Sequence, residues 1–302
     1  MTIKGLFTAL ITPFKQDGSL DEKGLEKLIA YQIDAGVDGL VVLGTTGETP
    51  TLDHEEKLKI LSIAKSVAKG KIHLMVGCAT NCTKTTIESA IEAEKMGADS
   101  LIIVTPYYNK PTQEGIFLHY KAIAEKVTLP ICVYNIAGRC GVNIETATLE
   151  RLAEIPNIVA VKEASGNILQ MNDVIFRVCH KRKDFTILSG DDALTLPLLA
   201  IGGHGLISVI SNIVPRTVKA MIDATATSFA KARELHFALK PICEAAFLES
   251  NPIPIKRMLA LSGLPAGKTR LPLWGPMPAV DKKLAEIVKN PLIIEETKEF
   301  QK

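Results

Sequence analysis

The chain has 302 residues, of which 47% are hydrophobic and 23% charged, and its formal net charge is +2. This composition is typical of a folded globular protein and excludes an intrinsically disordered chain. Lys and Arg are interspersed with Asp and Glu and form no basic stripe, so nucleic acid is not expected as a partner. No apolar stretch approaches the roughly 18 residues that span a bilayer, and the first 14 residues lack the features of a signal peptide. We therefore expect a cytoplasmic protein with no membrane partner.

Strand-like and helix-like segments alternate through the first two thirds of the chain. Short apolar runs predict eight strands, at residues 6–11, 39–43, 73–77, 100–105, 131–134, 159–162, 186–189 and 206–209. Amphipathic stretches between them predict helices at residues 23–35, 55–68, 83–96, 113–126, 147–154, 168–179 and 193–201. Thr83 and either Asp191 or Asp192 are candidate helix caps.

Eight strands in strict alternation with helices predict an α/β fold, a (β/α)8 TIM barrel. A doubly wound sheet is the rival, but it usually carries a glycine-rich phosphate turn after the first strand, where this chain has Thr12-Pro13-Phe14. Beyond about Pro215 the pattern predicts only helices, at residues 216–227, 230–248, 254–261 and 280–289. We expect a catalytic barrel over residues 1–226 and a C-terminal helical region over residues 227–302.

Lys162 stands at the end of a run, residues 158–161, that is mostly β-branched and predicts a strand buried on both faces. Burial removes water from an ammonium and so favours the neutral amine, which can attack a ketone to form a Schiff base. The alternative is a lysine whose stem packs while its head group reaches water or pairs with Glu163.

The carboxyl ends of the strands in a (β/α)8 barrel meet at one face, where active sites lie. The polar residues expected there are those of 44–48, 105–109, 134–135, 189–192 and 207–208, together with Arg139 and Lys162. Singly, each set has a structural explanation: a Gly-Thr-Thr-Gly turn, surface tyrosines, or an arginine paired with Glu145. Together they predict a site that binds a ketone and a carboxylate and transfers protons. The six dispersed cysteines show no metal-ligand spacing, so we expect no metal and no cofactor.

From about Gly5 to Pro276 the chain resembles the pyruvate-dependent class I aldolases of the dihydrodipicolinate synthase and N-acetylneuraminate lyase family, and the synthases most. The tracts that carry the resemblance are Gly44-Thr45-Thr46-Gly47-Glu48, Thr105-Pro106-Tyr107-Tyr108-Asn109-Lys110-Pro111, Tyr134-Asn135, Val161-Lys162-Glu163-Ala164, Leu188-Ser189-Gly190-Asp191-Asp192, Gly202-Gly203-His204-Gly205-Leu206-Ile207-Ser208 and Asn251-Pro252-Ile253-Pro254-Ile255-Lys256. The resemblance implies a lyase that condenses pyruvate with L-aspartate 4-semialdehyde on the diaminopimelate route to lysine. It also implies a homotetramer built as a dimer of dimers.

The resemblance implies catalytic roles for four residues and an inter-subunit role for a fifth. Lys162 forms the imine with pyruvate, and Tyr134 shuttles protons in a relay completed by Thr46 and Tyr108. Tyr107 reaches from the adjacent subunit into the site.

The resemblance also implies substrate-binding roles. Thr45 and Thr46 hold the pyruvate carboxylate, and backbone groups at Gly190 and Ile207 help to fix pyruvate and the lysine. Arg139 binds the carboxylate of the semialdehyde through its guanidinium. The chain reads Ala137-Gly138-Arg139-Cys140 where the synthase pattern is close to Pro-Ser-Arg-Thr.

A possible allosteric site for lysine is implied at His54, Asn81 and Tyr107. Lys57 and Thr85 stand where lysine-sensitive relatives carry histidine and glutamate, so we expect weak or absent inhibition by lysine.

Two alternatives remain at this stage. One is another pyruvate-dependent aldolase of the same fold, such as a lyase for sialic acid or a 2-keto-3-deoxy sugar acid, which would not need Arg139. The other is a catalytically silent relative, which would be expected to have lost Lys162 or the tyrosine relay.

Overall fold

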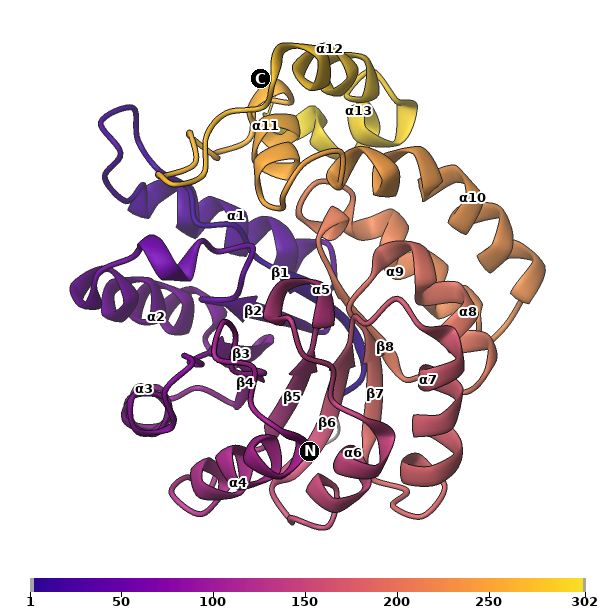
Figure 1. Ribbon diagram of the computed structural model, residues 1–302. Helices are drawn as coiled ribbons and strands as arrows, with labels where there is room; N and C mark the ends of the chain where they lie inside the picture. The colour runs from indigo at the N-terminus through magenta and orange to yellow at the C-terminus, as the bar shows by residue number, and fades with distance from the viewer. Residues whose placement is uncertain (1–2, 301–302) are drawn as a thin grey trace. The chain divides into compact units, whose positions relative to one another are not determined.

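A computed structural model describes residues 3–300. Eight parallel strands follow one another around a closed barrel in chain order, which confirms the predicted (β/α)8 fold (Figure 1). The strands are β1 (Gly5–Ala9), β2 (Gly39–Val42), β3 (His73–Gly77), β4 (Ser100–Val104), β5 (Ile131–Asn135), β6 (Ile158–Glu163), β7 (Thr186–Ser189) and β8 (Gly205–Ser208). Each lies within two residues of its predicted bounds.

Helices connect successive strands as predicted, with two refinements. They are α1 (Glu22–Asp34), α2 (His54–Ala68), α3 (Thr83–Lys95), α4 (Gln113–Ala124), α5 (Ala137–Cys140), α6 (Thr146–Leu152), α7 (Ile168–Val174), α8 (Thr195–Ala200) and α9 (Pro215–Ala224). The first refinement is that α7 continues as a π-helix over Ile175–Cys179. The second is that Thr83 is the first residue of α3 and not its cap, because its hydroxyl lies 2.9 Å from His119 Nδ1. Asp191 caps the short 3-10 helix Asp192–Leu194 that leads into α8, because its side chain accepts a hydrogen bond from the Ala193 N–H, whereas the N-cap of α8 itself is Leu194.

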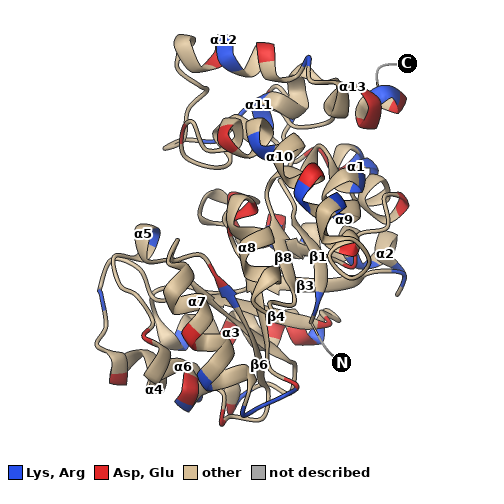
Figure 2. Cartoon of the chain, turned by 90° about the vertical axis from the view of Figure 1, so that its right-hand side faces the viewer, with Lys and Arg blue, Asp and Glu red and all other residues tan. Residues whose placement is uncertain are grey.

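The C-terminal part of the chain is helical, as expected. It contains α10 (Phe229–Ala246), α11 (Ile253–Leu261), α12 (Pro278–Ile287) and α13 (Pro291–Thr297). The last helix and the short α5 are additions to the predicted set. Figure 2 shows acidic and basic residues interspersed along these helices.

The chain divides into two compact units. The first contains residues up to Gly5 and Leu74–Ile207, and the second contains Leu6–His73 and the segment from Ser208 onward. The first unit therefore holds most of β3, all of β4 to β7 and most of β8, and the second holds most of β1, all of β2 and all of α9 to α13. The expected boundary between residues 226 and 227 stays a prediction, and its outer limits at residues 1–2 and 301–302 lie outside the described part.

Strand residues form the core of the first unit. Leu101, Ile103, Val133, Val161 and Ile187 are fully buried, as expected for parallel strands covered by helices.

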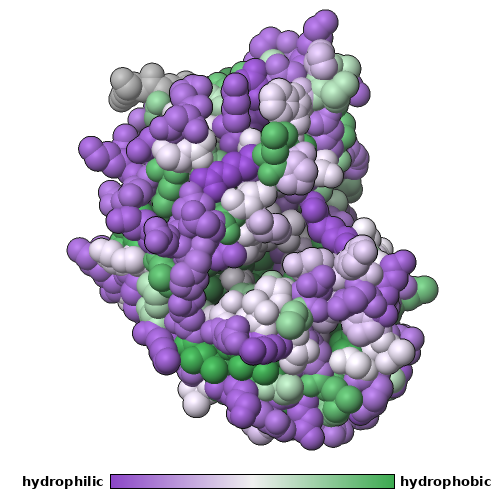
Figure 3. All heavy atoms as spheres, turned by 60° about the vertical axis from the view of Figure 1, so that its left-hand side comes forward, coloured by the Kyte–Doolittle hydropathy of each residue, from purple (hydrophilic) through white to green (hydrophobic). Residues whose placement is uncertain are grey.

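On the face drawn in Figure 3, hydrophilic residues predominate and hydrophobic residues form small patches between them. Within residues 3–300 no helix combines the length and the apolar character needed to cross a membrane.

Candidate active site

Lys162 lies near the carboxyl end of β6 and is only 6% exposed. It is in register with Tyr134 on the neighbouring strand β5, and its Nζ lies 4.3 Å from the centre of the Tyr134 ring. Within residues 3–300 the amine makes no hydrogen bond and no ion pair. The structure therefore presents a buried lysine without a fixed partner beside a buried phenol, an arrangement suited to a nucleophilic amine.

Glu163 does not pair with this lysine. Successive strand residues point to opposite faces, so the carboxylate of Glu163 points away from the amine of Lys162. It is fully buried and accepts hydrogen bonds from Asn135 Nδ2 at 3.0 Å, the Ser165 N–H at 2.7 Å and Gln170 Nε2 at 3.1 Å. The alternative in which Glu163 neutralises Lys162 is therefore wrong.

Gly190 follows β7 and lies against the stem of Lys162. A Cβ at this position would come within 2.7 Å of Ala164 Cβ and 2.9 Å of Lys162 Cε. The lysine methylenes thus occupy the space that any larger residue would fill, which gives Gly190 a steric role in addition to the expected backbone role.

We expect Gly190→Ala to lower kcat by about 100-fold, because a displacement of about 1 Å at the reacting group costs about that much. Steady-state kinetics on the purified variant checks this. Gly275→Ala is the matched control, since a Cβ there meets nothing within 4 Å. Wild-type kcat in a folded Gly190→Ala variant would contradict the steric role.

The two tyrosines after β4 are more exposed to solvent than Tyr134, which is 8% exposed. Tyr107 is 37% exposed and Tyr108 is 88% exposed, with a left-handed φ of 74°. Within one chain the side chain of Tyr108 therefore packs on very little, and the structure does not bury it beside Tyr134. The loop is held by Asn109, whose Nδ2 donates to the Asn81 carbonyl at 2.9 Å.

Arg139 lies on the exposed helix α5, which follows β5 directly. The next residue, Cys140, is buried, and its Sγ lies 3.2 Å from the Thr105 carbonyl, to which it donates. Burial raises the pKa of Cys140 to about 11, so the thiol keeps its proton and this donor near neutral pH. Cysteine thus ties the arginine-bearing helix to the end of β4 in place of the hydroxyl of the synthase pattern.

In the second unit, the loop after β2 carries Thr45 and Thr46. Within residues 3–300, neither backbone N–H finds a hydrogen-bond partner, although Thr46 is only 2% exposed. Neighbouring backbone donors without partners bind anions well. These two N–H groups are able to bind an anion, and the carboxylate-binding role that the resemblance implies for Thr45 and Thr46 stays a prediction.

One contact of this loop was not predicted. Asn251 Nδ2 donates to Thr46 Oγ1 at 2.9 Å, across 205 residues of sequence. The sequence signal was the Asn251-to-Lys256 tract, which marked a resemblance but suggested no role.

The remaining predicted residues lie in both units. Ile207 is fully buried in β8 of the first unit. His54 begins α2 in the second unit, whereas Asn81 and Tyr107 belong to the first, so their expected common site stays a prediction.

The second unit also holds a cavity of about 660 Å³. Phe14, Arg257, Trp274 and Asp281 are among the residues that line it, and none of the predicted site residues does. The predicted site residues, and not this cavity, carry the groups needed for the chemistry.

Known proteins resemble this chain over nearly its full length. The model of the dihydrodipicolinate synthetase family matches residues 2–290. The 4-hydroxy-tetrahydrodipicolinate synthase of Protochlamydia amoebophila is 53% identical over 96% of this chain and 97% of its own. The structure of dihydrodipicolinate synthase from Thermotoga maritima has a TM-score of 0.93 at 42% identity, covering 96% of this chain and 98% of that chain. A structure of the Acinetobacter baumannii enzyme complexed with pyruvate has a TM-score of 0.93 at 39% identity, covering 97% and 100%. The resemblance noted from the sequence is thereby confirmed, and the chain belongs to the dihydrodipicolinate synthetase family.

Proposed function

We propose that this chain catalyses the 4-hydroxy-tetrahydrodipicolinate synthase reaction, the condensation of pyruvate with L-aspartate 4-semialdehyde. The observation that carries the proposal is the buried amine of Lys162, without a fixed partner and 4.3 Å from the ring of Tyr134. The names of the relatives that match nearly the whole chain support the same reaction.

The reaction proceeds by a class I aldolase mechanism. The Lys162 amine attacks the ketone carbon of pyruvate, water leaves, and a protonated imine forms. Loss of a methyl proton gives an enamine, which attacks the aldehyde carbon of the semialdehyde, and the new alkoxide takes a proton. The amino group of the added chain then attacks the imine carbon, which closes the ring and releases Lys162 as the free amine.

Each step needs proton transfer close to Lys162. We assign this role to Tyr134, and its position in register with Lys162 on the neighbouring strand β5 supports the assignment. We assign Thr46 and Tyr108 to complete the relay, and Tyr107 to a neighbouring subunit. Because both tyrosines are exposed in the single chain, we propose that a second copy covers them and that the relay is complete only in the oligomer.

Substrate binding falls to groups at the ends of other strands. We assign the pyruvate carboxylate to Thr45 and Thr46, whose N–H groups have no partner within residues 3–300, and assign backbone support to Gly190 and Ile207. Arg139, on exposed α5, is assigned to the semialdehyde carboxylate.

Borohydride reduction with pyruvate, followed by peptide mass mapping, tests the proposal. The expected result is one pyruvate-derived adduct on Lys162. A coupled assay then compares semialdehyde condensation with cleavage of sialic acid and 2-keto-3-deoxy sugar acids. Adduct formation with sugar-acid cleavage alone would favour the lyase alternative, and no adduct at all would contradict the mechanism.

Inhibition by lysine is expected to be weak or absent. Glutamate at residue 85 would pair with the ammonium groups of the ligand, whereas Lys57 repels them and Thr85 offers no charge. Initial rates at increasing lysine concentrations check this, and Lys57→His combined with Thr85→Glu should increase sensitivity. A low-micromolar inhibition constant for the wild type would contradict the prediction.

We further propose a homotetramer that works in the cytoplasm. Large apolar side chains exposed in both units support subunit contacts, because aromatic residues are enriched at protein interfaces. Examples are Leu169 and Phe176 in the first unit and Phe229, Phe237 and Phe247 in the second. The free cysteines support a reducing compartment. Sedimentation velocity measures the assembly, and a monomer at micromolar concentration would contradict it.

A further inference from the structure

Glu48 ends the loop that carries Thr45 and Thr46, and it has an unusual environment for a carboxylate. It is 2% exposed and adopts a left-handed φ of 55°. Its backbone N–H donates to the Thr45 carbonyl at 3.1 Å, so the conformation of Glu48 is coupled directly to that of the loop. A left-handed backbone at a residue other than glycine persists only where neighbouring groups hold it.

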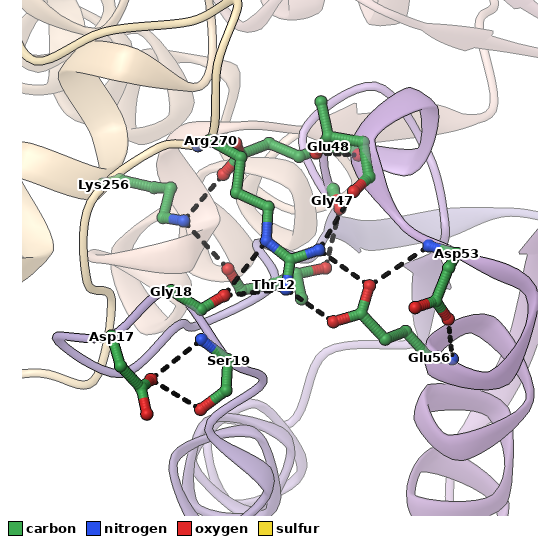
Figure 4. Close-up of polar contacts among 11 residues, drawn as sticks. Thr12, Asp17, Gly18, Ser19, Gly47, Glu48, Asp53, Glu56, Lys256 and Arg270 are labelled. Atoms are coloured by element: carbon green, nitrogen blue, oxygen red, sulfur yellow. Dashed lines mark hydrogen bonds and ion pairs between the residues drawn. The ribbon is translucent and has the colours of Figure 1, made fainter.

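Lys256, in α11, holds the side chain of Glu48 (Figure 4). Lys256 is 1% exposed, and its ammonium donates three hydrogen bonds, to Glu48 Oε1 at 2.6 Å, the Thr12 carbonyl at 3.0 Å and the Lys268 carbonyl at 3.1 Å. The second carboxylate oxygen accepts from the Arg270 N–H at 2.9 Å. All three ammonium donors are therefore used, which is the condition for a buried ion pair to be tolerated.

The ammonium of Lys256 stays mostly protonated near neutral pH. Burial lowers the pKa of Lys256 to about 8, and Glu48 opposes this shift. At pH 7 the Lys256 side chain is therefore protonated in most molecules.

The ammonium of Lys256 links the Thr45–Thr46 loop to the segment that follows β1. Thr12, whose carbonyl accepts from Lys256, donates from its own Oγ1 to the Gly47 carbonyl at 2.7 Å. Gly47 and Glu48 are thus held by Thr12, which follows β1, and by Lys256 of α11, while their own backbone N–H groups donate to the carbonyls of Gly44 and Thr45. Both N–H groups that face no partner, those of Thr45 and Thr46, lie inside this fixed segment.

Asn251 holds the loop at its centre. Its amide is a donor to Thr46 Oγ1, and within residues 3–300 that hydroxyl donates to no other group. A hydroxyl that accepts from an amide keeps its own proton for donation elsewhere. The contact therefore fixes the side chain of Thr46 and also the direction in which it donates.

We propose that Asn251 and Lys256 are positioning residues, through which the C-terminal helical segment holds the Thr45–Thr46 loop in the geometry that binds the pyruvate carboxylate. The inference rests on the proposed function of Thr45 and Thr46. Neither positioning residue is assigned a contact with substrate.

Lys256→Met tests the proposal against a matched control on the same helix. Arg257 pairs with Asp281 at 2.5 and 3.1 Å, and neither residue contacts the loop, so Arg257→Met removes a neighbouring ion pair only. We expect Lys256→Met to raise the KM for pyruvate by about 10- to 100-fold and to leave the KM for the semialdehyde nearly unchanged. Arg257→Met should change neither constant, even if both variants lower the Tm. Equal effects of the two variants on the pyruvate KM would overturn the proposal.

Substitutions of Asn251 provide a second test that leaves the buried ion pair intact. They test the positioning role even if Lys256→Met does not fold. Asn251→Ala should raise the pyruvate KM. Asn251→Asp has the same shape but turns the donor into an acceptor, so the Thr46 proton is drawn to the aspartate and kcat should fall further than in Asn251→Ala. Wild-type values in both variants would contradict the positioning role.

Borohydride trapping at graded pyruvate concentrations separates this inference from the proposed function. A wild type that forms no adduct on Lys162 would remove the proposed function itself. Adducts that form at the same half-saturating pyruvate concentration in wild type and Lys256→Met would overturn the positioning inference alone.

Discussion

Lys162→Ala and Lys162→Arg are each expected to lower kcat/KM for pyruvate by at least about 10⁴-fold, because either change removes the covalent nucleophile. Alanine has no amine, and the guanidinium of arginine stays protonated and cannot form an imine. The measurement is the coupled condensation assay together with a mass spectrum after borohydride reduction, in which the pyruvate adduct should be missing.

Lys183→Ala is the control for this experiment, because Lys183 is an exposed lysine of the same unit. It should keep both the adduct and the rate. Intact turnover in a folded Lys162→Ala protein would rule out the Schiff-base mechanism.

We expect Tyr134→Phe to lower kcat by about 10²- to 10⁴-fold, the usual contribution of a positioned proton-transfer group. The substitution keeps the ring beside the Lys162 amine and removes only the hydroxyl. Because imine formation, enamine formation and ring closure all move protons, the loss should appear in kcat more than in the KM for pyruvate. Exchange of the pyruvate methyl protons in D₂O, followed by NMR, checks the enamine step without the second substrate.

Tyr120→Phe is the matched control, since Tyr120 is also a buried phenol of the first unit. Its hydroxyl donates to the Ile103 carbonyl at 2.8 Å, and burial raises the pKa of Tyr120. Losing that hydrogen bond should cost about 1 kcal/mol of unfolding free energy and leave kcat unchanged. If Tyr134→Phe exchanged the methyl protons as fast as Tyr120→Phe does, the shuttle role would be wrong.

The strands were predictable because a buried parallel strand requires a short run of branched apolar residues, as in residues 158–161. Helix details were less predictable, because they depend on contacts distant in sequence. Thr83 has the chemistry of a cap, but His119 lies near enough to contact its hydroxyl instead. The spacing of apolar residues in the sequence likewise did not indicate the π-helical continuation of α7 or the short helix α5.

Only part of the site was predictable, because some of its contacts join residues that are distant in sequence. A lysine at the end of a buried strand can be recognised from neighbours in sequence, and β6 places it as expected. Whether Glu163 neutralises that lysine depends on the face of β6 to which each side chain points, and on which hydrogen-bond donors lie on that face. Asn135, Ser165 and Gln170 provide those groups, and only the folded chain brings them together.

The sequence by itself determined the barrel and the candidate nucleophile, because strand burial and the βα period depend on residues that are close along the chain. It determined the family through the motif tracts that resemble those of the synthases. Tertiary structure alone decided what surrounds those residues: the glycine against the lysine stem, and the Glu48–Lys256 pair that spans 208 residues. The physical reason is that a buried charge is tolerated only with partners at hydrogen-bond distance, and folding chooses those partners irrespective of their separation in sequence.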